Sequence, residues 1–157
     1  MITRKWLKNH CAFDAGIKWF EKNVHDDIGI SALVEKLMLE NGFSLANWLV
    51  TNNLNKGHNI EYAVFAAQQV LSIYEEEYPE DKRPREAIEL AEGYLRCPSK
   101  KTAHAAAHVA SHEAYAAAYA SHTAIDSAVD AAVDAAERMR LGKVIIDFGL
   151  SLIAKGN

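Results

Sequence analysis

The sequence predicts an all-α protein, folded as a compact bundle of about six to eight helices with a central alanine-rich helix. Apolar residues recur at spacings of three and four, and Ser, Gly and Pro stand where helices would begin and end. No alternating run of β-branched residues bounded by turn residues is convincing as a strand. The chain has 157 residues, of which 50% are hydrophobic, so we expect one domain (residues 1–157) with a substantial core.

The first third of the chain is expected to form three helices. The first spans about residues 3–23 and has one apolar face, made of Trp6, Phe13, Ile17 and Phe20. We expect Ser31 to cap a short second helix that stops at Gly42, where glycine would take the left-handed conformation. Ser44 is expected to cap the third helix, which ends near Gly57.

The following segment predicts a longer helix, with apolar side chains at Ile60, Val64, Ala67, Leu71 and Tyr74. Pro79 and Pro84 bracket a loop, and Pro84 suits the first turn of a fifth helix because its missing N–H costs nothing there. Pro98 separates that helix from the alanine-rich segment. The C-terminal stretch is amphipathic again and predicts a helix that covers the core with Leu141, Val144, Ile145, Phe148 and Leu152.

Between Ala103 and Ala136 the sequence holds 16 alanines, so helix is the strong expectation there. Thr123 and Asp126 have capping-box spacing, which would allow a break near Ser121. Rings repeat along one face of this segment: His104, His108, His112, Tyr115, Tyr119 and His122. We interpret this stripe as a packing or partner-contact surface without metal, because a single helix cannot surround a tetrahedral ion. Carboxylates at every fourth position could hold Mg²⁺, but a solvated helix face is the preferred interpretation of Asp126, Asp130 and Asp134.

The charge is small overall and uneven along the chain. A net charge of −4 disfavours general nucleic-acid binding. Residues 75–92 hold eight acidic and three basic groups, a net −5, whereas the first 24 residues hold five basic and two acidic groups, a net +3. Such asymmetry is typical of a surface that meets a charged partner, and equally of a solvated helix face.

Other features bear on the compartment. No run of about 18 apolar residues could cross a membrane, and the N-terminus lacks a secretory signal, so we expect a cytoplasmic protein. Cys11 and Cys97 fit neither a metal knuckle nor a redox pair, which favours two buried thiols.

The loop before the fifth helix concentrates charge at Glu80, Asp81, Arg83 and Arg85. Guanidinium groups pair well with carboxylates or phosphates, so this loop is a structural clamp or a partner-binding site. Arginines at a helix N-terminus oppose the helix dipole, and we therefore expect them to have acidic partners elsewhere in the fold. The clamp is the preferred interpretation.

Enzyme signatures are missing from the sequence, which has no Gly-x-Ser-x-Gly elbow, no Gly-rich phosphate loop and no His-Glu-x-x-His. We therefore expect a protein that is not an enzyme and needs no cofactor.

The segment Asp81-Lys82-Arg83-Pro84-Arg85-x-Ala87-Ile88-Glu89, followed by an alanine-dominated helix, resembles an immunity-protein family of bacterial polymorphic toxin systems. Cys11, Phe13, Gly16 and Trp19 are similar to the family's opening helix, and Asn47-Trp48-Leu49 to its internal Trp segment. Lys82 departs from the tighter Asp-Arg-Pro-Arg expected there. Members of the family are also common in phages and mobile elements.

The resemblance implies a binding protein that neutralises a toxin and has no chemistry of its own. One alternative is a phage-encoded inhibitor of host defence, such as an anti-CRISPR protein, with a defence nuclease as its partner. Another is a metal protein that uses the histidine stripe. The expected partner is a protein, with a homodimer also possible, and neither nucleic acid nor membrane is expected to bind directly.

Overall fold

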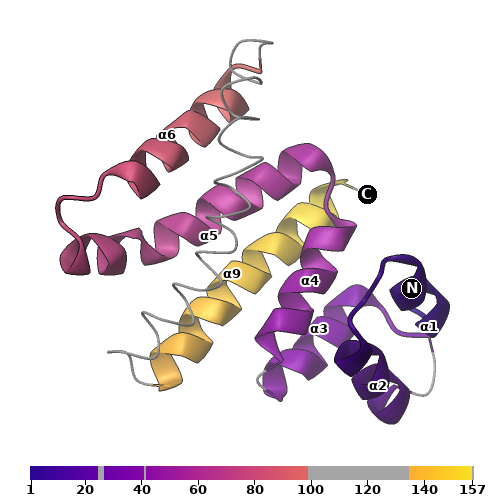
Figure 1. Ribbon diagram of the computed structural model, residues 1–157. Coiled ribbons are helices and arrows are strands. Elements are labelled where there is room, and N and C mark those ends of the chain that lie inside the picture. Colours follow the sequence, from indigo (N-terminus) through magenta and orange to yellow (C-terminus); the bar gives the residue numbers. More distant parts are fainter. Residues whose placement is uncertain (25–26, 41, 99–134, 157) are drawn as a thin grey trace.

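The computed structural model describes residues 1–24, 27–40, 42–98 and 135–156. Within these ranges the chain forms seven helices (Figure 1). They are α1 (Arg4–Asn9), α2 (Asp14–Asn23), α3 (Ile30–Leu39), α4 (Phe43–Asn53), α5 (Lys56–Glu77), α6 (Arg83–Arg96) and α9 (Ala135–Gly156).

The predicted all-α class is confirmed for the described part of the chain, where an isolated antiparallel bridge joins Ile2 to Ile28. The Ile2 N–H donates to the Ile28 carbonyl at 2.8 Å in this bridge. The alanine-rich stretch, predicted as the central helix with a break near Ser121, lies outside the described residues.

The prediction of one helix over residues 3–23 is wrong, because a turn at Cys11 separates α1 from α2. Cys11 adopts a left-handed conformation with φ 56°, which costs free energy for a residue other than glycine. The turn lets the Ala12 N–H donate to the Leu7 carbonyl at 2.9 Å and buries the Ala12 side chain. The apolar face does not continue through the turn, and Phe13, expected on that face, is 45% exposed.

Gly42 differs from its predicted role as a left-handed residue that ends the second helix. Its φ is −81°, and it is the N-cap of α4 rather than the end of α3. The Gly42 N–H donates to the Leu37 carbonyl at 2.7 Å, and a Cβ at Gly42 would lie 3.0 Å from that same oxygen. Close approach to the preceding helix therefore explains the glycine.

The predicted caps at Ser31 and Ser44 are also wrong, because both serines lie inside the first turn of a helix whose N-cap is a glycine. The third helix was predicted to end near Gly57, but α4 ends at Asn53 and Gly57 lies in the first turn of α5. There the cap is Asn55, whose side-chain oxygen accepts the His58 N–H at 2.9 Å. Both α3 and α4 therefore begin slightly earlier than the predicted serine caps would place them.

The core joins α1 to α4 with the first half of α5 and with α9. In this region α3 packs on α4, and α9 packs on both α4 and α5. The largest fully buried side chains are Leu7, Leu33, Leu37, Leu49, Ile145, Ile146, Leu152, Val34 and Val50. The predicted amphipathic C-terminal helix is confirmed as α9, and it supplies part of this core.

Three helices meet most closely at Gly149 of α9. A Cβ at this position would lie 2.4 Å from Cγ1 of Val50 on α4 and 2.7 Å from Cε2 of Tyr62 on α5. The Tyr62 hydroxyl donates to Oδ1 of Asn47 at 2.7 Å, and burial raises the pKa of Tyr62 well above its usual range. Glycine at this position therefore leaves the space that the Val50 and Tyr62 side chains occupy against α9.

The predicted fourth and fifth helices are confirmed as α5 and α6, which form an antiparallel hairpin at one side of the molecule (Figure 1). Pro84 stands in the first turn of α6, as predicted, and α6 ends at Arg96 before Pro98. In α6, Ile88 is the buried residue. Among the described residues, α6 contributes none to the core cluster, and α5 contributes only residues of its first half.

Candidate functional site

The charged loop predicted from the sequence is the turn of the α5–α6 hairpin. α5 continues to Glu77, and the turn brings the chain back to the start of α6 at Arg83. The rings of Tyr74 and Tyr78 pack at a centroid distance of 5.0 Å, and the Asp81 N–H donates to the Tyr78 carbonyl at 3.1 Å. This turn is therefore ordered by local contacts.

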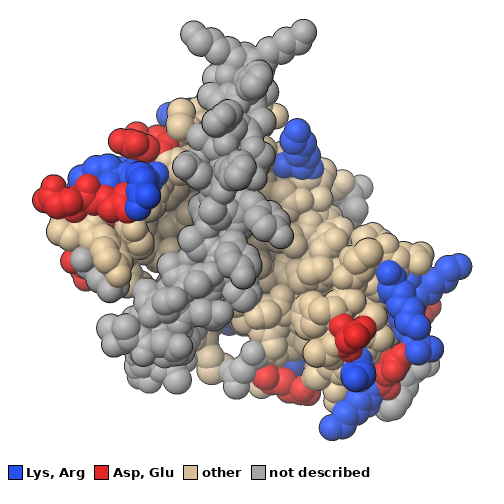
Figure 2. Space-filling model, viewed as in Figure 1, with Lys and Arg blue, Asp and Glu red and all other residues tan. Residues whose placement is uncertain are grey.

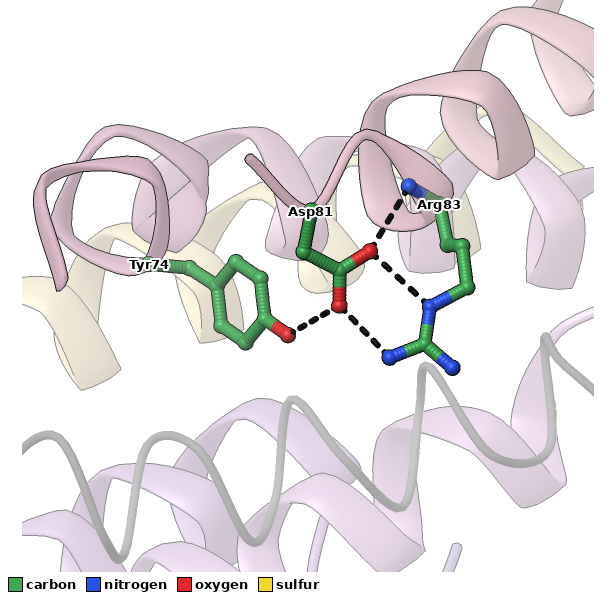
Figure 3. Close-up of polar contacts among 3 residues, drawn as sticks. All are labelled: Tyr74, Asp81 and Arg83. Carbon is green, nitrogen blue, oxygen red and sulfur yellow. Dashed lines mark hydrogen bonds and ion pairs between the residues drawn. The ribbon is translucent and has the colours of Figure 1, made fainter. Parts of the chain in front are cut away.

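Asp81 is the centre of the polar contacts in the turn (Figure 3). Its Oδ1 accepts the Arg83 backbone N–H at 3.1 Å and Arg83 Nε at 2.9 Å. Its Oδ2 accepts Arg83 Nη2 at 2.6 Å and the Tyr74 hydroxyl at 2.8 Å. The carboxylate thus binds the guanidinium group in a bidentate manner, caps the start of α6 and fixes a tyrosine of α5.

These contacts favour the ionised form of Asp81. The hydrogen bonds from Arg83, followed by the one from Tyr74, hold the pKa of Asp81 well below its usual range. The same contact raises the pKa of Tyr74, because its hydroxyl donates to a carboxylate. Asp81 is therefore a charged acceptor at every physiological pH.

Arg85 makes the second bidentate pair and joins the two helices directly. Its Nε donates to Oε1 of Glu75 at 2.7 Å and its Nη2 to Oε2 at 2.5 Å. The Arg85 hydrogen bonds hold the pKa of Glu75 below its ordinary value. A hydrogen bond from Gln68 to Glu92, at 2.6 Å, links the helices farther from the turn.

Of the four predicted site residues, the two arginines were expected to have acidic partners elsewhere in the fold, and they differ in this respect. Arg85 has a partner on another helix, whereas Arg83 pairs with Asp81, only two residues away. The Asp81 side chain is 19% exposed, while the Arg83 side chain is 83% exposed and Glu80 lies on the surface. Whether these residues act as a clamp or as a binding site stays a prediction.

Sequence reasoning missed Tyr74 and Glu75. Tyr74 belongs to the apolar repeat of the long helix, which suggested packing rather than a hydrogen bond to a loop. Glu75 lies in an acidic run, and its pairing with Arg85 follows from the register between α5 and α6. Neither pair has a spacing within one helix that would identify it.

Charged side chains gather at two ends of the molecule, over the turn of the hairpin and over α1 and α2 (Figure 2). Acidic and basic side chains both appear at each end in this view. At the end formed by α1 and α2, Arg4 pairs with Glu21.

The prediction of two buried thiols is wrong, because Cys11 and Cys97 are both exposed. Each cysteine lies at the end of a helix: Cys11 in the turn after α1, and Cys97 at the C-cap of α6. The chain leaves the packed helix surface at both positions, which places these side chains at the surface.

The histidine and tyrosine stripe (His104, His108, His112, Tyr115, Tyr119 and His122) lies outside the described residues, as do Asp126, Asp130 and Asp134. Among the residues that the structure describes, no group of three His, Cys, Asp or Glu side chains could hold a metal ion. No described helix combines the length and the apolar character needed to cross a membrane.

Comparison with known proteins found a similarity that covers the α5–α6 hairpin. Neither the curated proteins nor the solved structures gave a match to this chain. A family model does match residues 49–100, which comprise the end of α4, α5, α6 and the two residues after Pro98. Over these residues the chain is similar to the family described as Imm-5 like putative immunity protein.

Proposed function

We propose that this protein is an immunity-type inhibitor, which binds and neutralises a partner protein such as a toxin and has no catalytic activity of its own. The observation that carries the proposal is the match of an immunity-protein family to residues 49–100. The matched residues form the hairpin in which Arg83, Arg85 and their acidic partners hold the turn.

The geometry of the hairpin suits a binding role. An inhibitor of this kind needs a rigid scaffold and a complementary patch. Two bidentate ion pairs and the Tyr74 hydrogen bond fix the turn before any partner arrives. Such preorganisation lowers the entropy cost of association.

The setting is part of the same proposal. The chain acts as a single domain in the cytoplasm, without a cofactor, and its partner is a protein rather than nucleic acid. In a phage or mobile element the same binding mechanism would act against a host defence protein instead of a toxin.

Co-expression tests this function. Each gene that flanks this one in its native genome would be induced in a bacterial host, with and without the full chain, and growth would be followed. We expect one neighbour to stop growth, the chain to restore it, and the two proteins to co-purify at a fixed stoichiometry. Growth arrest that the chain does not relieve, with no complex formed by any neighbour, would contradict the proposal.

A further inference from the structure

The two arginines of the hairpin turn differ in what their ion pairs connect. Arg85 pairs with Glu75 of α5, so its guanidinium group joins two helices. Arg83 pairs with Asp81, which lies only two residues earlier in the turn. The exposed fraction differs in the same sense, because the Arg83 side chain is 83% exposed and the Arg85 side chain 51%. Arg85 therefore connects two elements of the fold, whereas Arg83 is held at the surface.

Asp81 has two other hydrogen bonds that hold it in the turn. Its Oδ1 accepts the backbone N–H of Arg83 at 3.1 Å, and its Oδ2 accepts the Tyr74 hydroxyl at 2.8 Å. Both contacts remain when the guanidinium group is removed. An ion pair with so exposed an arginine also adds little to stability, because solvent screens it. The turn therefore keeps its hydrogen bond to α5 without the Arg83 side chain.

The contacts to Asp81 also fix the orientation of the Arg83 guanidinium group. Nε donates to Oδ1 at 2.9 Å and Nη2 donates to Oδ2 at 2.6 Å, so Asp81 binds the side edge of the group. A guanidinium group has five N–H donors, and three of them, on Nη1 and Nη2, are not directed at this carboxylate. The other terminal nitrogen points away from Asp81 (Figure 3). The end edge, formed by Nη1 and Nη2, can bind a second carboxylate in a bidentate manner.

A surface arginine held in this way is suited to bind another protein. Ordering a long side chain on binding costs free energy, and the pair with Asp81 already orders this one. Arginine is enriched among the residues that dominate binding energies, and its planar edge matches a carboxylate. The surrounding charge does not repel a carboxylate, because residues 80–86 hold three acidic and three basic groups and are neutral together.

We infer that Arg83 is a partner-contact residue, which binds a carboxylate group on the surface of the partner protein through the Nη1–Nη2 edge of its guanidinium group. This inference rests on the proposed immunity-type function and adds a contact residue and the chemistry of the group that it binds. It also divides the two roles that the sequence left open, since Arg85 is the clamp and Arg83 is the contact.

Amide hydrogen exchange of the full chain separates these two roles. Arg85→Gln should speed exchange in α6, because Arg85 pairs with a residue of α5. Arg83→Gln should leave exchange in α6 unchanged, because Arg83 pairs with a residue of its own turn. Exchange in α6 that is as fast in Arg83→Gln as in Arg85→Gln would mean that Arg83 holds the hairpin, and would overturn the division of roles.

Binding would be measured by calorimetry with the protein that the chain neutralises in co-expression. Arg83→Gln should weaken binding by about 30-fold, as expected for an arginine that dominates a contact. Arg83→Lys keeps the charge but lacks the planar edge, so binding should still be weaker by about tenfold. The matched control is Arg4→Gln, since the Arg4 side chain on α1 is 60% exposed and also pairs with a carboxylate, that of Glu21. This control should leave the affinity unchanged.

A double-mutant cycle identifies the carboxylate on the partner. Each exposed Asp or Glu of the partner would be changed to Asn or Gln, and each variant titrated against the unmodified chain and against Arg83→Gln. We expect one of these changes to weaken binding of the unmodified chain by about tenfold or more, with no further effect on Arg83→Gln.

Different failures have different meanings. Unchanged affinity in Arg83→Gln, or equal affinity of Arg83→Lys and the unmodified chain, overturns the contact and leaves the immunity-type function standing. Weaker binding of Arg83→Gln without coupling to any carboxylate of the partner overturns the assigned chemistry. If co-expression shows no flanking gene product to be neutralised, the proposed function fails, and this inference fails with it.

Discussion

The core and the hairpin of this protein are stabilised by different interactions. The core, made by α1 to α4, the first half of α5 and α9, buries aliphatic and aromatic side chains, and no described polar or charged residue is buried. The α5–α6 turn instead contains two bidentate Arg–carboxylate pairs, and α6 contributes one buried side chain among its described residues, Ile88. Apolar packing has no titrating group and is not screened by salt, whereas ion pairs respond to both pH and ionic strength. The hairpin should therefore open more easily than the core.

The largest effect should come from emptying the centre of the core. Leu49 is completely buried in α4, so Leu49→Ala should lower the free energy of unfolding by about 2–5 kcal/mol, through lost burial and the cavity left behind. Chemical denaturation measures this loss. The matched control is Leu39→Ala on the surface of α3, which should change stability by less than about 0.5 kcal/mol. Equal effects of the two variants would mean that the core is wrongly placed.

The next effect concerns the closest helix approach. Gly149→Ala places a methyl group against Val50 and Tyr62, and overpacking of this kind costs about 1–3 kcal/mol. Gly93→Ala is the control, because the added methyl group meets nothing and alanine favours helix by up to about 1 kcal/mol. Melting curves should move in opposite directions for the two variants. A rise in melting temperature for Gly149→Ala would contradict the close packing of α4, α5 and α9.

A smaller and local effect is expected from the ion pair that crosses the hairpin. Arg85→Ala leaves Glu75 without its bidentate donor, so α6 should exchange its amide hydrogens faster while α9 keeps its rates. The global melting temperature should fall by less than in Gly149→Ala, because the Arg85 side chain is about half exposed. Glu75→Gln should reproduce the local effect. Faster exchange throughout the molecule would show that hairpin and core unfold as one unit.

The smallest effect should come from Tyr74→Phe, which removes one of the four hydrogen bonds to Asp81 and leaves the bidentate Arg83 contact in place. The pKa of Asp81 should rise towards its usual value, because one of the groups that lowers it is gone. A carboxylate titration by nuclear magnetic resonance would detect this change. Tyr78→Phe, which removes the hydroxyl group from the neighbouring ring, serves as the control.

The contrast between the regions also explains what could be predicted from the sequence. Periodic apolar residues identified α5, α6 and α9, because burial of one helix face is a property of the local pattern. The break at Cys11 was missed because a left-handed cysteine has no sequence signal, and it is stabilised by the Ala12 to Leu7 hydrogen bond. Gly42 was predicted to adopt a left-handed conformation. The structure shows instead that glycine is needed there because its backbone lies close to Leu37 of the preceding helix.

The charged loop was recognised from its composition, but its contacts were not. Pairing of Arg85 with Glu75 depends on how α5 and α6 are aligned in space. The Arg83 to Asp81 pair depends on the conformation of the turn, which also lets the Asp81 carboxylate cap α6. Local periodicity carries neither kind of information, which explains why the fold class was predicted and the geometry of the site was not.

The central claim is that charge holds the hairpin and apolar burial holds the core, and amide hydrogen exchange from pH 7 to 2 tests it most directly. The folded-state pKa values of Asp81 and Glu75 lie below their ordinary values, so their stabilisation is complete above the unfolded-state values of about 3.9 and 4.3. It is lost progressively as pH falls below those values, towards the folded-state pKa of each group. After correction for intrinsic rates, protection in α6 should therefore fall before protection in α9. Equal loss in both helices, or earlier loss in α9, would contradict the claim.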